Sequence, residues 1–151
     1  MKPTKAINEW SCALACIEAT LANYHNPIKQ RDIIKAYSPF FSAWRKNQEG
    51  LLSRAEIPYL LELLGYRFGL MLFTSDKDEF LATFTKYFNQ QRYWASFLIV
   101  HQPTNHCYAI RQLNAQGIEA MEPDQSNPAF VPMTFEDIHQ NRSPEYILLC
   151  S

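Results

Sequence analysis

The chain predicts an α+β fold, in which helices come first and an antiparallel sheet follows. The first half carries apolar residues at helical spacing together with helix-capping signals. The second half carries short apolar or alternating runs that are separated by turn residues. With 151 residues and no internal repeat or low-complexity linker, the chain is expected to form one domain over residues 1–151.

The helices of the first half begin with a strongly apolar one. Residues 12–25 are apolar on nearly all sides, which predicts a buried helix. Asn26 and Pro27 suit the N-cap and the first helical position, so a second helix is expected from there through Tyr37. Residues 40–50 show no clean period and predict a loop with a short helical turn.

Two further helices are predicted from their capping signals. Ser53 and Glu56 have the spacing of a capping box, and Gly65 is expected to end the helix that they open. Asp76 is a suitable N-cap for a helix over about residues 77–90.

The second half predicts the sheet. A hairpin turn is expected over residues 114–117, and a short helix over residues 134–140 should precede the last strand. The predicted strands span residues 66–73, 93–100, 107–113, 117–121 and 146–150.

Charge and targeting signals argue against several classes of partner. The formal net charge of −1 gives no electrostatic reason to expect nucleic acid as a partner. The N-terminus lacks an apolar signal core, and no apolar run is long enough for a membrane span. We therefore expect a cytoplasmic protein whose four cysteines are free thiols, with signal-less secretion left open. The oligomeric state is not predicted.

Cys12 is the most informative residue, because it should open the first helix. A cysteine on an apolar helix usually fills the core, which is the role expected for Cys16. Cys12 differs because the free N–H groups and the dipole of a first turn favour a negative charge on sulfur. This position predicts a nucleophilic thiolate.

A histidine that could activate this thiol and a carboxylate that could orient the histidine lie far along the chain. His106 opens an apolar strand after a turn, and His101 at the other end of that turn is its competitor. Glu122 and Asp124 follow the next strand, and either carboxylate could orient a histidine by accepting its ring N–H. A cysteine, a histidine and a carboxylate are the parts of an activated thiol nucleophile.

The same residues do not predict a metal centre. Cys12 and Cys16 could share a helix face, but the chain has no C-x-x-C pair. A strand would point His106 and Cys107 to opposite faces. We therefore expect neither a metal nor a cofactor.

Five motifs, taken in order, resemble those of the bacteriocin-processing peptidase domains. These papain-like cysteine enzymes cleave leader peptides after a double glycine. The matching stretches are residues 11–17 with Tyr24, residues 49–53 with 64–66, residues 105–110, residues 121–123 and residues 134–138.

The resemblance implies a papain-like fold, with an N-terminal helical half packed on a C-terminal antiparallel sheet. It implies Cys12 as nucleophile, His106 as base and Glu122 in the place of the usual aspartate, with Asp124 as the alternative third residue. The substrate would be a peptide or protein, and no cofactor is implied.

The chain also departs from the family pattern. Ser11 and Ala13 flank the cysteine where the family has aspartate and glycine, and Ala6 stands in place of the oxyanion glutamine. Asn8 is the nearest amide that could donate to an oxyanion. Two interpretations stay open: a cysteine hydrolase or acyltransferase, and a peptidase-like module that binds a peptide segment without cleaving it.

Overall fold

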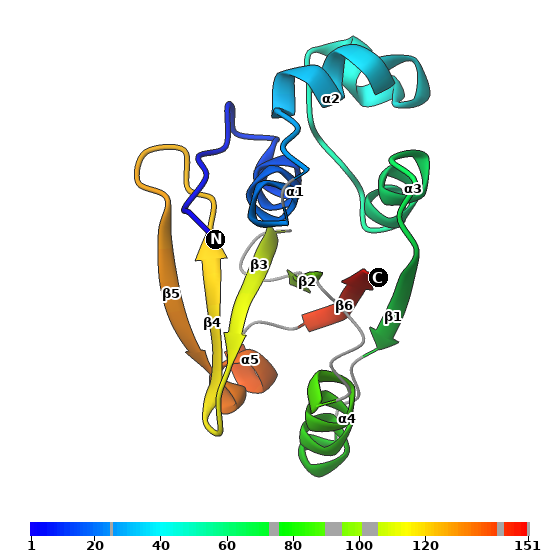
Figure 1. Ribbon diagram of the computed structural model, residues 1–151. Helices are drawn as coiled ribbons and strands as arrows, with labels where there is room; N and C mark the ends of the chain where they lie inside the picture. Colours follow the sequence, from blue (N-terminus) through cyan, green and yellow to red (C-terminus); the bar gives the residue numbers. More distant parts are fainter. Residues whose placement is uncertain (25, 73–75, 90–94, 101–105, 142–143, 151) are drawn as a thin grey trace.

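The computed structural model describes residues 1–24, 26–72, 76–89, 95–100, 106–141 and 144–150. Helices lie on both faces of an antiparallel sheet, which confirms the predicted α+β class (Figure 1). The helices are α1 (Cys12–Asn23), α2 (Gln30–Tyr37), α3 (Glu56–Leu63), α4 (Lys77–Asn89) and α5 (Phe135–Asn141), with 3-10 turns at Ser38–Phe40 and Ser42–Lys46. No helix in these ranges is long and apolar enough to cross a bilayer.

The sheet has six strands in the order β1-β6-β2-β3-β4-β5, and every neighbouring pair is antiparallel. The last strand therefore pairs between two earlier ones. The strands are β1 (Phe68–Leu72), β2 (Ala95–Val100), β3 (His106–Leu113), β4 (Gly117–Glu122), β5 (Ala129–Thr134) and β6 (Pro144–Cys150).

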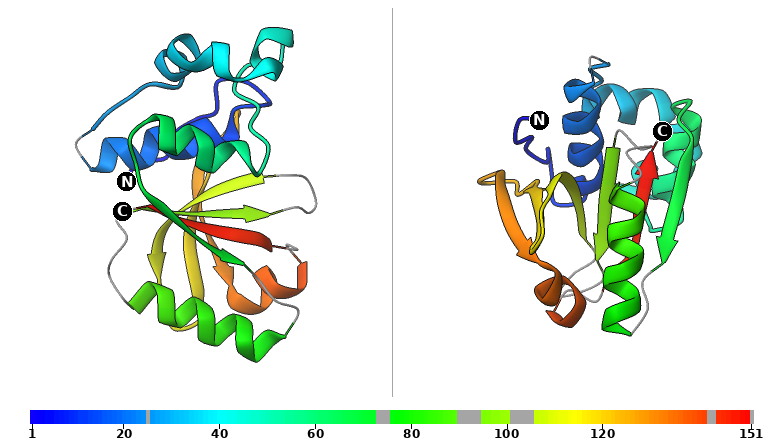
Figure 2. Two further views of the ribbon diagram at one scale, coloured as in Figure 1. Left: turned by 90° about the vertical axis from the view of Figure 1, so that its right-hand side faces the viewer. Right: turned by 60° about the horizontal axis from the view of Figure 1, so that its bottom comes forward.

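The sheet separates two apolar clusters. The left view of Figure 2 shows α1, α2 and α3 on one side of the sheet and α4 and α5 on the other. Successive side chains of a strand point to opposite faces, so β3 contributes Cys107 and Ala109 to one cluster and Tyr108 and Ile110 to the other. The first cluster holds α1 and α3 against the sheet, and it underlies the candidate site.

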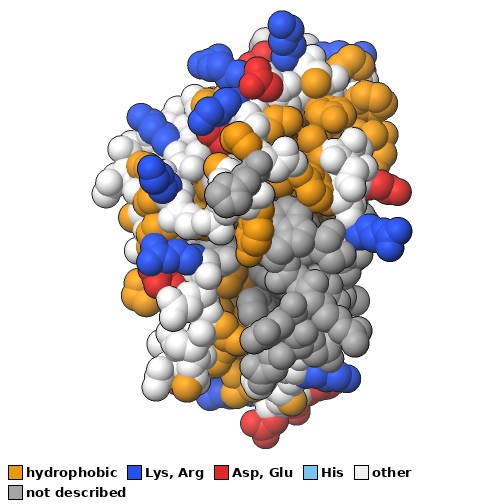
Figure 3. All heavy atoms as spheres, in the orientation of Figure 1, with side chains coloured by type: hydrophobic (Ala, Val, Ile, Leu, Met, Phe, Trp, Pro, Cys, Tyr) orange, Lys and Arg blue, Asp and Glu red, His pale blue; other side chains and the backbone are white. Residues whose placement is uncertain are grey.

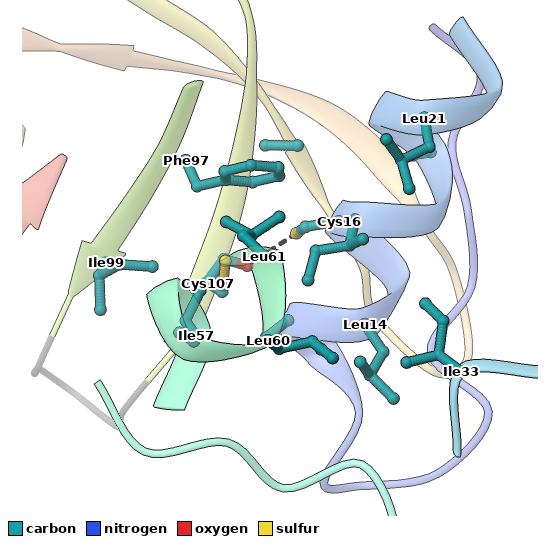
Figure 4. Close-up of a cluster of buried hydrophobic side chains, with 14 of the residues drawn as sticks. Leu14, Cys16, Leu21, Ile33, Ile57, Leu60, Leu61, Phe97, Ile99 and Cys107 are labelled. Carbon is teal, nitrogen blue, oxygen red and sulfur yellow. Dashed lines mark hydrogen bonds between the residues drawn. The ribbon is translucent and has the colours of Figure 1, made fainter. Parts of the chain in front are cut away.

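Helix α1 is buried on nearly all sides, as its composition predicts. Leu14, Ala15 and Cys16 have no exposed surface, and Ile17 and Leu21 are almost fully buried. The buried side chains of α1 lie against α3 and the sheet in Figure 4. A helix enclosed in this way has a fixed position, so its N-terminal residue is fixed as well.

The predicted start of the second helix is wrong. Helix α2 begins at Gln30, not at Pro27, because a carboxylate of α1 caps it from outside. Glu18 accepts hydrogen bonds from the backbone N–H of Gln30 at 3.1 Å and from the Lys29 ammonium at 2.9 Å. Partial burial opposes ionisation, yet these bonds to Lys29 and Gln30 hold the pKa of Glu18 below its usual value.

The Gln30 side chain, which the sequence analysis did not single out, ties α2 to the N-terminal segment. It is 2% exposed, and its amide nitrogen donates to the Lys5 carbonyl at 2.8 Å. Its amide oxygen accepts the backbone N–H of Ile7 at 3.3 Å. The segment that leads into α1 is therefore held by a buried polar side chain.

The cap predicted for α4 is confirmed, whereas that of α3 is confirmed only in part, because α3 begins at Glu56 and no side chain caps its first turn. The Ser53 N–H donates to the Glu56 carboxylate at 3.0 Å, and Gly65 ends α3 with a φ of +89°. Asp76 accepts the N–H of Glu79 at 2.8 Å at the start of α4. These local signals predict the helix ends well, because the bonds form within one turn.

Strand β5 was not predicted. It contains Pro132, which lacks the N–H that a central strand needs. In the structure β5 is an edge strand that pairs with β4 alone, so a proline is tolerated there.

Gly50 lets a turn approach the start of α1 closely. Its φ is +89°, and a Cβ atom at this position would lie 2.8 Å from the Ser11 Cβ and 3.1 Å from a Leu14 methyl. Any side chain there would have to displace the first turn of α1.

We predict that Gly50→Ala destabilises the protein more than Gly65→Ala does. Both glycines have a φ of +89°, so both variants carry the strain of a left-handed residue, about 1–2 kcal/mol. Only Gly50 adds a clash, which costs roughly a further 1–3 kcal/mol, since nothing lies within 4 Å of a Cβ at Gly65. Urea unfolding of the two variants measures the difference, and equal losses would contradict the close approach.

Candidate active site

The structure brings Cys12, His106 and Glu122 together. Cys12 is the first residue of α1, His106 the first of β3 and Glu122 the last of β4. Helix α1 packs on β3, and antiparallel pairing puts the end of β4 beside the start of β3. All three residues line one cleft of about 850 Å³.

His106 is held between the other two. Its Nε2 donates to Glu122 Oε1 at 2.5 Å, and its ring packs edge-on against Tyr108 with 4.7 Å between centroids. The Cys12 side chain lies close enough to the ring to raise the pKa of His106. Because Glu122 occupies Nε2, Nδ1 is the nitrogen left for Cys12.

The charge state of His106 follows from these contacts. Burial lowers the pKa of His106, but the hydrogen bonds to Cys12 and Glu122 outweigh it and raise the pKa from 6.5 to about 10. His106 is therefore an imidazolium at neutral pH. A cation at this position stabilises negative charge on a neighbouring sulfur.

The start of α1 also favours negative charge on the Cys12 sulfur. Ser11 occupies the N-cap, but its side chain makes no hydrogen bond into the helix, and the first turn holds no acidic residue. The Ser11 hydroxyl is engaged instead with the backbone of Asn8. The N–H groups of the first turn are thus not taken by a side-chain cap and can favour an anion at Cys12.

Asn8 makes contacts that the sequence analysis did not predict. Its Nδ2 donates to the Glu49 carbonyl at 2.9 Å, and its Oδ1 accepts the Trp10 N–H at 2.8 Å. The side chain thus joins two loops beside the cleft, which is a structural role. An oxyanion role for Asn8 remains a prediction, because it would need the second N–H of the same amide.

Ala6 and Asp124 also line the cleft. Ala6 is buried and offers only a methyl group where the resembling family has an amide side chain. Asp124 does not bond to His106; its Oδ1 accepts the backbone N–H groups of Ser126 and Asn127. The Asn127 and Ser126 bonds lower the pKa of Asp124, so this carboxylate serves as the cap of a turn.

The remaining thiols with described side chains are buried. Cys16 is fully buried, and its Sγ donates to the Cys107 carbonyl at 3.3 Å (Figure 4). Burial above all, with the neighbouring Cys107 thiol, raises the pKa of Cys16 well above its usual value. His101 and the Cys150 side chain lie outside the described residues. Within the described residues, no group of three or more His, Cys, Asp or Glu side chains is arranged so that it could hold a metal ion.

Several residues that line the cleft carried no predictive signal in the sequence. Trp10, Arg54 and Gln125 come from three separate loops or turns, and nothing in their local patterns indicates that they meet. Only Trp10, two positions before Cys12, could have been suspected from its adjacency to the candidate nucleophile.

The fold is that of a known class of peptidase domain. The structure matches the peptidase domain of Streptococcus ComA, a bi-functional ABC transporter involved in a quorum-sensing pathway, with a TM-score of 0.69, 12% identity and coverage of 99% of this chain and 97% of that one. It also matches the peptidase domain of Streptococcus mutans ComA, with a TM-score of 0.57, 13% identity and coverage of 100% and 99%.

These matches confirm the predicted resemblance to bacteriocin-processing, papain-like peptidase domains at the level of the fold. No protein-family model and no curated protein matches the sequence. The similarity therefore lies in the tertiary structure, over essentially the whole of each chain.

We predict that Cys12 reacts with iodoacetamide before Cys16 and Cys107 do. Cys12 lines the cleft beside an imidazolium, whereas the other two are buried. His106→Ala should slow labelling of Cys12 near neutral pH, and the control His139→Ala on α5 should not. A short time course read by mass spectrometry measures this; equal labelling of the three thiols would contradict an activated Cys12.

The raised pKa of His106 also predicts how stability depends on pH. A folded-state pKa above the unfolded value means that the native state binds the proton more tightly. The stabilisation from His106 should be complete below about pH 6.5 and decline as pH rises towards about 10. The difference in free energy of unfolding between wild type and His106→Gln measures it. A difference that grows with pH would contradict the assignment.

Proposed function

We propose that the protein is a cysteine hydrolase that acts on a peptide or amide bond. The single observation that carries this proposal is the position of His106, which is hydrogen-bonded to Glu122 and lies beside Cys12 in one cleft. A thiol, an imidazolium and an orienting carboxylate are what nucleophilic acyl transfer requires. The peptidase fold supports the same class of reaction, although fold alone does not establish activity.

In the first half of this reaction, the Cys12 thiolate attacks the substrate carbonyl carbon. The C–N bond then breaks, and the leaving amine takes the proton of His106 Nδ1, so a thioester on Cys12 and a neutral imidazole remain. Glu122 holds the imidazole ring of His106 in a fixed orientation and stabilises its protonated form.

In the second half, His106 takes a proton from water, and the resulting hydroxide attacks the thioester carbon. The C–S bond breaks, the acid leaves, and the thiolate–imidazolium pair returns. An amine in place of water would give an acyltransferase by the same steps. The oxyanion of each tetrahedral intermediate would accept the backbone N–H of Cys12, at the uncapped start of α1.

A second function is peptide binding without cleavage. It is favoured by the shortage of side-chain donors where the oxyanion of a reaction intermediate would lie. Ala6 supplies no donor, and the Asn8 amide already donates to Glu49. Loss of one oxyanion donor costs roughly a hundred- to a thousandfold in rate, so turnover could fall to a trace while the cleft is kept.

Hydrolysis of a fluorogenic peptide library would test the proposal. We expect measurable turnover in wild type, none above background in Cys12→Ala, and a loss of roughly a hundred- to ten-thousandfold in His106→Ala. Glu122→Gln should lower the rate, because the amide no longer stabilises the imidazolium. Asp124→Asn is the matched control and should retain activity, since the asparagine can still cap the turn.

Covalent labelling separates the two functions. A peptide-like electrophile should modify Cys12 in the hydrolase and be blocked by iodoacetamide. Binding of peptides without turnover or labelling would instead establish the binding module.

A further inference from the structure

A smaller pocket opens beside the cleft, and we call it the side pocket. Its volume is about 440 Å³, and its walls include Glu9, Trp10, Trp44 and Glu49. Asn8, Glu9, Trp10 and Gln125 line both the cleft and the side pocket. The two cavities are therefore neighbours that share part of their lining.

The side pocket is lined by two glutamates that have no ion-pair partner among the described residues. They are Glu9 and Glu49, which come from two loops that are far apart in the sequence. Among the described residues that line the side pocket, none is Lys or Arg. Other glutamates are paired, as Glu18 is with Lys29 and Glu119 with Arg111.

Indole rings complete the walls of the side pocket. Trp44 is fixed, because its Nε1 donates to the Leu51 carbonyl at 2.7 Å and its ring stacks on Phe41 with 4.4 Å between centroids. Trp10 lies two residues before Cys12 and lines both cavities. Trp44 is only 3% exposed, so the partly exposed Trp10 is the indole that a ligand can contact. An indole face and carboxylates without an ion pair both attract an organic cation, and a cavity of this size admits a long side chain.

We propose that the side pocket binds the cationic side chain, Lys or Arg, of the peptide whose backbone occupies the cleft. This inference rests on the proposed peptide-binding function and names the substrate class: peptides with a basic residue near the reacting bond. Glu9 and Trp10 line both cavities, which puts the selective groups close to Cys12.

The preference should be modest, because both glutamates are exposed and water screens their charge. An exposed ion pair and a cation–π contact together correspond to roughly a three- to tenfold preference for a basic over a neutral side chain. Added salt should weaken the preference, since it screens exposed charges.

The test uses the full chain with Cys12→Ala, so that peptides bind without being cut. This protein is incubated with an equimolar library of random decapeptides, and the retained peptides are identified by mass spectrometry. We expect Lys and Arg to be enriched roughly three- to tenfold over Gln, and Asp and Glu to be depleted. Adding Glu9→Gln with Glu49→Gln should abolish the enrichment, whereas the exposed control Glu62→Gln should leave it intact.

The charge reversal Glu9→Lys gives a second readout that does not depend on losing a contact. It should shift the enrichment towards acidic peptides, and circular dichroism confirms that each variant is folded. Peptides retained without a basic preference, a preference that survives in the double variant, or no retention at all would overturn the inference. A basic preference together with no cleavage by wild type would support the inference and reject only the hydrolase.

Discussion

The packing of α1 across β3 is the contact on which the candidate site depends. Leu14, Cys16 and Ile17 are buried between the sheet and the other helices, and the Cys16 thiol donates to the backbone of Cys107. Cys107 follows His106 directly, so the contact that closes the core also sets the spacing between the ends of α1 and β3. Two residues from opposite halves of the chain thereby meet at one cleft.

The start of α1 is further held from outside by the turn at Gly50 and by the Gln30 side chain of α2. Gly50 brings its turn against Ser11 and Leu14 at a distance that no side chain would permit. The buried amide of Gln30 forms hydrogen bonds with the backbone on both sides of Ala6, at Lys5 and Ile7. Such supports keep a reactive side chain in one geometry without contacting it, which is what preorganisation requires.

In the candidate site, two opposing effects act on the pKa of His106, and the effect of its charged neighbours is larger than the effect of burial. Partial burial by itself would lower the pKa of His106 and leave it neutral. Cys12 and Glu122 reverse this, because negative charge on the neighbouring sulfur and on a carboxylate at 2.5 Å favours the charged ring. The extra methylene of glutamate, compared with the aspartate of the resembling family, does not prevent this contact, since β4 ends where the side chain can reach the ring.

Local signals in the sequence determined the class of the fold, most helices and strands, and the order of cysteine, histidine and carboxylate. Caps such as Ser53 with Glu56 and Asp76 with Glu79 act within a single turn, so a short stretch of sequence is enough to predict them. Only the tertiary structure decided where α2 begins, that β5 is a strand, and that Glu122 rather than Asp124 contacts His106. The physical reason is the same in each case, because each feature depends on a contact between distant parts of the chain. These contacts are the Glu18 carboxylate from another helix, the place of β5 at the edge of the sheet and the pairing of β3 with β4. Local periodicity in the sequence carries no information about such contacts.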